Sequence, residues 1–417
     1  MGSTSGRQAA MPFIMVTVLL DMMSIGLIVP VLPKLIGSFM DSGAGTAFAY
    51  GAAQLVFAIA QFFAAPVLGA LSDRYGRRPV LLLGLVGMAI NFFVTALASA
   101  LWMLLAVRFM GGALCANVAV ANAYVADISQ PKDRVKNYGL LGAMFGLGFI
   151  LGPVVGGVLG NIDVRWPFFL AGGLTLLNSV YGYLVLPESL PVEHRRQFDL
   201  VRANPFSSLL RLRQLKGVET LMWIMGLSIL AQFCLHTSWF LFTEFKFGWT
   251  PKDNGYSLLA VGLMIVIVQG GLLRVVQKHI PLHHLVRVGL VSSTVAFAAY
   301  GAAPEGWMMY AIVVANVFGY MVQPGLQSLV ANAVDPTRQG ESMGAVSSIN
   351  SVAAVLAPLL ATPLLAAGAG YPQGDWRIGI AFYLCATIQA VATVIGFRYF
   401  SRSRGDDDCA VPERAQV

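Results

Sequence analysis

A long series of apolar segments is the feature that most constrains the fold of this chain. The hydrocarbon core of a bilayer is about 30 Å thick, so a helix that spans it needs roughly 20 predominantly apolar residues. Twelve such segments follow one another, at residues 12–33, 47–71, 79–98, 101–127, 138–160, 166–186, 217–241, 253–275, 284–303, 306–332, 341–367 and 375–400. Only 11% of residues are charged, compared with about 25% in soluble domains. The sequence therefore predicts an all-α polytopic membrane protein with twelve transmembrane helices.

Lysine and arginine are distributed unevenly between the two sides of these segments. With the N-terminus inside, 21 of the 27 fall in or beside cytoplasmic segments, and Arg108 falls inside a span. The remaining five are in outer loops: Lys34, Arg165, Lys246, Lys252 and Arg377. Because cytoplasmic loops carry an excess of positive charge, we expect both termini to be cytoplasmic. The same bias accounts for the net charge of +7 without a nucleic-acid partner.

The two halves of the chain carry matching residues at a constant offset of 205 positions. The matching pairs are Ala126 and Ala331, Pro131 and Pro336, Gly139 and Gly344, and Pro153 and Pro358. We therefore predict two pseudo-symmetric six-helix bundles, at 1–186 and 217–401. A cytoplasmic linker at 187–216 joins them, and a cytoplasmic tail occupies 402–417. Repeats of this kind predict two bundles that rock to expose a central cavity alternately to each side.

A charged, glycine-containing segment, residues 69–78 (GALSDRYGRR), separates the second and third predicted spans. Gly69 and Gly76 permit close backbone approach and dihedral angles that other residues resist. Asp73 could cap a neighbouring helix N-terminus or pair with an arginine. The basic residues expected to keep the loop cytoplasmic are Arg74, Arg77 and Arg78. The spacing closely resembles the signature that the major facilitator superfamily carries between its second and third helices. That resemblance implies a transporter in which these residues form a gating motif.

The fifth predicted span has small residues at helical spacings that allow close helix contact. Its pattern, Gly-x5-Gly-Pro-x2-Gly-Gly, consists of Gly146, Gly152, Pro153, Gly156 and Gly157. One interpretation is a tight structural crossing of two helices. The pattern also resembles the antiporter signature of the same superfamily, which implies exchange of a substrate for protons.

Two charged residues lie inside predicted spans, where charge is costly unless it faces water or a partner. Arg108 begins the string RFMGG, which resembles the fourth-helix motif of the superfamily; it either binds backbone carbonyls or sets the protonation of a nearby carboxylate. Asp21 is the acidic residue that falls within a span rather than at its edge. We expect Asp21 to carry the coupled proton, with a neutral acid hydrogen-bonded to a neighbouring helix as the alternative.

Several short strings narrow the resemblance to the tetracycline/proton antiporters. They lie at residues 19–30 (LLDMMSIGLIVP), 65–69 (APVLG), 123–128 (AYVADI), 186–189 (LPES), 241–244 (LFTE), 247–249 (FGW) and 339–340. The matches run through both halves of the chain. The resemblance implies a monomeric protein in the bacterial inner (plasma) membrane that exports a drug.

The expected substrate site departs from that subfamily at three ionisable positions. This chain has Asn91 and about Ser293 where those antiporters have aspartates, and about Ile265 where they have a histidine. Gln61 and Gln269 fall where theirs have glutamine. The departures change how the site can bind a metal-chelated drug, so tetracycline stays open as a substrate.

Further polar residues in the spans are candidates for the substrate cavity. They are Asn117, Asn122, Gln232, His236, Asn316, Gln323 and Asn350. Each alone is more often a hydrogen bond between helices than a ligand contact. His236 is the strongest candidate, because a side chain that titrates near neutrality could replace a lost ionisable group. We predict a substrate cavity built by Gln61, Asn91, Asn117, His236, Gln269 and Gln323.

The sequence favours proton-coupled efflux of a small hydrophobic or amphipathic compound. Uptake or exchange of an endogenous metabolite is the alternative, and a non-transporting membrane receptor is a third possibility. We expect no catalysis, because no nucleophile elbow, phosphate-binding loop or metal-ligand spacing occurs. The four cysteines are far apart, which predicts neither disulfide nor metal site. The expected partners are the substrate and the bilayer, and the expected energy source is a proton gradient with no cofactor, although sodium is an open alternative.

Overall fold

The computed structural model describes residues 3–115, 117–129, 134–195, 218–334 and 339–407, and regular structure in these ranges is helical. The N-terminal half contains α1 (Ser3–Ile28), α2 (Leu32–Gly37), α3 (Gly43–Tyr75), α4 (Arg77–Ala96), α5 (Leu101–Leu114), α6 (Asn117–Ile128), α7 (Arg134–Ile162) and α8 (Trp166–Val185). The C-terminal half contains α10 (Glu219–Phe247), α11 (Pro251–Ile267), α12 (Leu273–Gln277), α13 (Leu282–Ala302), α14 (Trp307–Ala315), α15 (Val322–Ala333), α16 (Gln339–Gly368) and α17 (Ile380–Asp407).

Ten of the described helical segments are long and apolar enough to cross a bilayer, and α14 with 319–333 makes an eleventh span that is bent by 53°. The predicted fourth span is divided into α5, of 14 residues, and α6, of 12 residues. Each piece alone is shorter than a membrane crossing. The predicted all-α membrane fold with two bundles is confirmed, with two of its spans interrupted.

The two interruptions occupy corresponding positions in the halves. The helix α5 ends before Cys115, and the offset of 205 places Cys115 at residue 320, inside the short 3₁₀ turn Gly319–Met321 that separates α14 from α15. The prediction of continuous helices at 101–127 and 306–332 is therefore wrong. At the second break the Asn316 side chain accepts a hydrogen bond from Ser292 Oγ at 2.9 Å. Paired interruptions at equivalent positions are typical of substrate sites in transporters with repeats.

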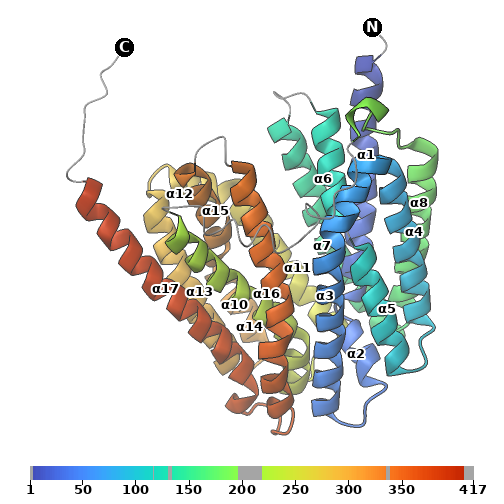
Figure 1. Cartoon of the computed structure of the whole chain (residues 1–417). Helices are drawn as coiled ribbons and strands as arrows, with labels where there is room; N and C mark the ends of the chain where they lie inside the picture. The colour runs from blue at the N-terminus through green and yellow to red at the C-terminus, as the bar shows by residue number, and fades with distance from the viewer. Residues whose placement is uncertain (1–2, 116, 130–133, 196–217, 335–338, 408–417) are drawn as a thin grey trace.

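The bundles meet along two pairs of helices, α3 with α16 and α7 with α11. In Figure 1, α1 begins and α17 ends at the same end of the molecule, and the two bundles diverge toward that end. An even number of membrane crossings places both ends of the chain on one side. At the opposite end, α3 and α16 lie side by side.

Glycines along the α3 and α16 contact show where the bundles touch. A Cβ atom added at Gly43 would lie 3.2 Å from the Ala369 Cβ, and one added at Gly51 would overlap the Thr362 side chain. Nearer the chain termini, a Cβ at Gly69 of α3 or at Gly344 of α16 would meet nothing within 4 Å. The bundles are therefore packed closely at one end and separated at the end that holds the termini.

A buried aromatic cluster reinforces the closely packed end. The rings of Phe242 and Phe382 are 4.2 Å apart, and Trp239 makes an edge contact with Tyr300 at 5.2 Å. These residues belong to one buried apolar cluster that also includes Tyr50 of α3, so the cluster spans both bundles. Aromatic pairs of this kind stabilise a core beyond the area that they bury.

The helix α7 is packed against both bundles through its small residues. A Cβ atom added at Gly152 would lie 2.8 Å from the Gly26 Cα of α1, and one at Gly156 would overlap the carbonyl group of Leu27. On another face, a Cβ at Gly157 would lie 2.5 Å from the carbonyl oxygen of Pro251, which begins α11. The predicted close crossing is thus present at these three positions. At Gly146 an added Cβ would meet nothing within 4 Å, so this member of the predicted motif makes no tight contact.

This difference predicts opposite outcomes for two matched substitutions in α7. Gly156→Ala should lower the free energy of unfolding by about 1–3 kcal/mol, because its methyl group overpacks the α1 contact. Gly146→Ala should leave it unchanged or raise it by less than about 1 kcal/mol, because alanine favours the helix and space is available. Thermal unfolding of both variants in detergent measures this, and equal melting temperatures would contradict the described contact.

Candidate functional site

A cavity of about 620 Å³ lies between the two bundles. Most of its wall comes from α10, α11, α13, α15, α16 and α17 of the C-terminal bundle. The N-terminal bundle contributes α3, α7 and Val29, which follows α1. Cavities that bury small organic ligands have volumes of about 300–1,000 Å³. The cavity is therefore large enough for a drug-sized compound.

Four of the six residues predicted for the substrate cavity line it: Gln61, His236, Gln269 and Gln323. Ile265 and Ser293, near which we expected this chain to depart from the subfamily it resembles, line it as well. Asn91 does not line this cavity. Its amide donates a hydrogen bond to the carbonyl oxygen of Val107, so Asn91 ties α4 to α5. The side chain of Asn117 lies outside the described residues.

Hydrogen bonds hold several lining side chains in place. Gln61 Nε2 donates to the carbonyl oxygen of Cys115 at 3.4 Å, where α5 is interrupted. Gln54 Nε2 donates to the Tyr50 hydroxyl at 3.2 Å on the same helix. On α10, Gln232 Nε2 lies 3.0 Å from His236 Nε2. Fixed polar groups of this kind orient a ligand in a largely apolar pocket.

A π-helix that the sequence interpretation missed carries Gln269. Residues Val268–Leu272 form this turn between α11 and α12, and Gln269 is exposed toward the cavity. Single π-turns inside α-helices occur frequently at functional sites. The adjacent pair Gly270 and Gly271 was the signal in the sequence, because glycine lowers the cost of departing from α-helical geometry.

Asp21 lies apart from the central cavity, inside the N-terminal bundle. It is 6% exposed. It lines a separate small pocket formed by α1, α4 and α6, together with Thr17, Leu81, Leu85 and Ala121. On the same helix, the carbonyl oxygen of Thr17 accepts a hydrogen bond from Asn178 of α8 at 2.9 Å. The structure thus buries this carboxyl group inside the N-terminal bundle, outside the central cavity.

Arg108 lies behind the wall of the central cavity. Its guanidinium group is 5.8 Å from the centre of the Phe57 ring, and Phe57 lines the cavity. Cys115, at the interruption that follows α5, lies within electrostatic range of both Arg108 and Asp21. The break in the fourth span at Cys115 is therefore near both of the charged residues that the sequence analysis identified inside predicted spans.

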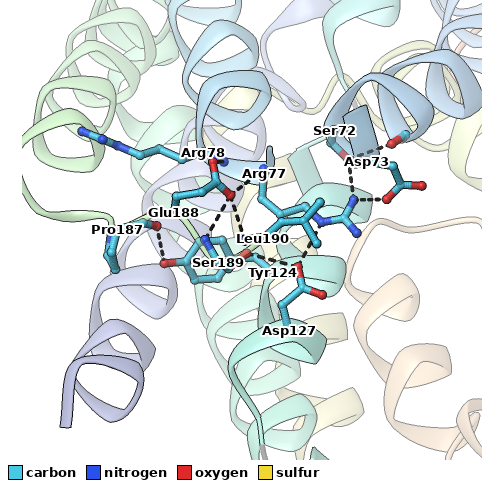
Figure 2. Close-up of polar contacts among 11 residues, drawn as sticks. Ser72, Asp73, Arg77, Arg78, Tyr124, Asp127, Pro187, Glu188, Ser189 and Leu190 are labelled. Atoms are coloured by element: carbon cyan, nitrogen blue, oxygen red, sulfur yellow. Dashed lines mark hydrogen bonds and ion pairs between the residues drawn. The ribbon is translucent and has the colours of Figure 1, made fainter. Parts of the chain in front are cut away.

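The predicted loop motif forms a network at one end of the N-terminal bundle (Figure 2). The Arg77 side chain pairs with Asp73 at 2.5 Å and with Asp127 of α6 at 3.1 Å, and it donates to Ser72 Oγ at 2.7 Å. Ser189 Oγ also donates to Asp127, at 3.1 Å. Of the two partners predicted for Asp73, the structure thus shows an arginine.

Glu188, which follows α8, caps the start of α4. Its carboxylate accepts hydrogen bonds from the backbone N–H groups of Arg77 at 2.8 Å and Arg78 at 3.3 Å (Figure 2). A carboxylate at a helix N-terminus satisfies free N–H groups and opposes the positive end of the helix dipole. The sequence interpretation used Glu188 only as part of a family string and missed this role.

Only Gly76 separates α3 from α4, and its φ angle is +106°. A side chain there would be strained and would also collide with Glu188. By contrast, a Cβ at Gly69 would meet nothing within 4 Å, and Arg74 extends over the ring of Tyr75 at 5.2 Å. In the described part of the chain, this network joins residues of the N-terminal bundle to Glu188 and Ser189, which follow α8.

Comparisons with known proteins agree with this architecture. The family model for the Major Facilitator Superfamily matches residues 14–358 and 284–416. The tetracycline resistance protein of class C from Escherichia coli is 36% identical over 376 residues, covering 90% of this chain and 94% of that protein. The class B protein, also from Escherichia coli, is 34% identical over 372 residues and covers 88% and 92%.

Two solved structures share the fold. A bacterial homologue of the human lysosomal transporter Spinster superposes with a TM-score of 0.76 at 16% identity, covering 95% of this chain and 97% of that one. The human organic anion transporter MFSD10 gives 0.67 at 24% identity, covering 94% and 99%. With two bundles, a cavity between them and a family match over most of its length, this multi-pass membrane protein belongs to the major facilitator superfamily of transporters.

Proposed function

We propose that this transporter exports a small hydrophobic or amphipathic compound across a bacterial inner membrane in exchange for protons. The observation that carries the proposal is the drug-sized cavity between two bundles whose described residues pack closely at one end and diverge toward the other. If the termini are cytoplasmic, as the positive charge bias indicates, the separated end faces the cytoplasm. A compound would then enter from inside the cell and leave when the bundles rock.

Asp21 and Arg108 supply the proton-coupling part of the proposal. A carboxyl group buried in a membrane protein is costly when charged, so it tends to exchange a proton as water gains access. Cys115, which follows α5, is in electrostatic range of both Asp21 and Arg108. The Arg108 guanidinium group lies 5.8 Å from the centre of the Phe57 ring, which lines the cavity. A ligand bound against Phe57 would therefore be one ring away from Arg108.

The relatives support efflux, since several are named tetracycline resistance proteins. Uptake or exchange of an endogenous metabolite is the second candidate. It is favoured by the uncharged residues Ile265 and Ser293 in the cavity wall, where the tetracycline/proton antiporters have ionisable ones. The direction of transport separates the two, because energised cells accumulate less of an exported compound.

Asp21→Asn should abolish transport that is driven by a pH gradient, since an amide cannot release a proton. Loss of at least about tenfold in initial rate is expected, with ligand binding retained because Asp21 does not line the central cavity. Proteoliposomes with an imposed pH gradient measure the rate. Asp41→Asn is the matched control, because Asp41 is exposed between α2 and α3. Full gradient-driven transport by Asp21→Asn would reject the coupling role.

Expression in a bacterial host that lacks its own pumps should raise the tolerated concentration of at least one amphipathic drug several-fold. Asp73→Ala should reduce that tolerance, because Arg77 loses its closest carboxylate partner in the loop network. Its effect on stability should be small, below about 1 kcal/mol, since the Asp73 side chain is 42% exposed. A susceptibility panel that includes tetracyclines provides the measurement. Identical susceptibility with the intact protein, the variant and an empty vector would leave efflux without support.

A further inference from the structure

The wall of the central cavity contains no aspartate, glutamate, lysine or arginine among the residues that the structure describes. Its polarity comes instead from carboxamides and hydroxyls. The carboxamides are Gln54, Gln61, Gln232, Gln269, Gln323, Gln389, Asn316 and Asn350. Each carboxamide can both donate and accept hydrogen bonds. The wall can therefore satisfy many arrangements of neutral polar groups and offers no countercharge to an ion.

His236 is the one histidine among the described residues of this wall, and its contact with Gln232 fits an uncharged ring. Gln232 Nε2 lies 3.0 Å from His236 Nε2. An amide nitrogen only donates, so the ring nitrogen must accept, and an imidazolium has no acceptor. With Gln232 Nε2 as the donor, His236 is uncharged and adds a further neutral polar group to the wall.

A positively charged side chain, that of Arg108, lies behind this wall. Arg108 packs behind Phe57, and Phe57 lines the cavity. A cationic ligand would lose its hydration shell, find no carboxylate in the wall, and meet the field of an arginine one ring away. Each of these effects disfavours binding, because charges interact strongly where water is excluded.

Aromatic side chains, together with aliphatic ones, supply the apolar part of the wall. Those that line it include Phe57, Phe149, Phe233, Phe240, Phe297 and Trp239. Flat ligands gain from stacked or edge contacts with such rings. The cavity therefore matches a flat aromatic compound with several uncharged hydrogen-bonding groups.

We propose that the substrate binds as an electrically neutral aromatic compound rather than as a cation or a cationic metal chelate, and that exchange for protons is therefore electrogenic. The proposal rests on the proposed function and specifies its substrate class. When one neutral molecule leaves and n protons enter, n positive charges move inward and nothing balances them. The membrane potential then drives transport together with the pH gradient, whereas exchange of a monovalent cation for one proton moves no net charge.

The binding part is tested with two probes on the purified full-length protein. Chloramphenicol is an uncharged nitroaromatic amide with two hydroxyls, and ethidium is a permanent aromatic cation. Equilibrium dialysis should show chloramphenicol bound at least about tenfold more tightly than ethidium. Ethidium bound as tightly as chloramphenicol, or more tightly, would overturn the proposal, and so would an absence of chloramphenicol binding.

Two substitutions of the same chemistry test whether the cavity itself sets this preference. Gln269→Glu places a carboxylate in the wall and should shift the preference at least about tenfold toward ethidium. Gln277→Glu, eight residues later in the same span, makes the same charge change outside the cavity and should leave the preference unaltered. An equal shift in both variants would show that the cavity wall is not responsible.

The charge movement is tested in proteoliposomes at equal pH, with a potassium diffusion potential imposed by valinomycin. The potential alone should drive movement of chloramphenicol, and collapsing it should slow transport in a pH gradient. Transport that responds to the pH gradient but not to the potential overturns electrogenic exchange and leaves proton-coupled efflux standing. Chloramphenicol binding without transport under either gradient overturns the proposed function and leaves the neutral binding site standing.

Discussion

The close approach of α7 to α1 on one face and to α11 on another is the contact on which the arrangement of this protein depends. In a bilayer, lipid is as apolar as leucine, so helices gain little from hiding apolar surface and associate through close packing. Glycine at positions 152, 156 and 157 permits backbone contact where any side chain would collide. The same helix therefore holds its own bundle together and joins it to the other one.

Among the described residues, the close contacts between the two bundles lie toward one end, and the position of the cavity follows from this. Tight packing around Gly51 and Gly157 and an aromatic cluster that includes Phe242 close one side. Toward the termini, Gly69 and Gly344 face open space. Two bundles that touch at one end and separate at the other enclose a space between them, and alternating access requires these contacts to exchange sides.

Charge and polarity are divided between the halves. Asp21, Arg108 and the network around Arg77 belong to the N-terminal bundle. The uncharged amides that surround the cavity come mainly from the C-terminal bundle. Such a division keeps Asp21 out of the wall of the central cavity. In the proposed mechanism, coupling would pass through the packing of α3 and α5 rather than through a hydrogen bond shared with the ligand.

Much of the fold could be predicted from the sequence. The lengths of the apolar segments, the distribution of basic residues and the repeat at an offset of 205 can all be read from the chain itself. The candidate site could be predicted only in part. Gln61, His236, Gln269 and Gln323 line the cavity as predicted, whereas Asn91 bonds to backbone and the capping role of Glu188 was missed. Glu188 is 111 residues from the Arg77 N–H that it caps, so spacing along the chain could not reveal the pair.

The sequence by itself determined that this is a duplicated, helical membrane protein with few buried charges. The tertiary structure decided which polar residues share one cavity, where two spans break, and that a π-helix presents Gln269. The physical reason lies in the solvent. In water, hydrophobicity marks the inner face of a helix, but in lipid both faces are apolar, so the rotation of each helix is set by packing against its neighbours.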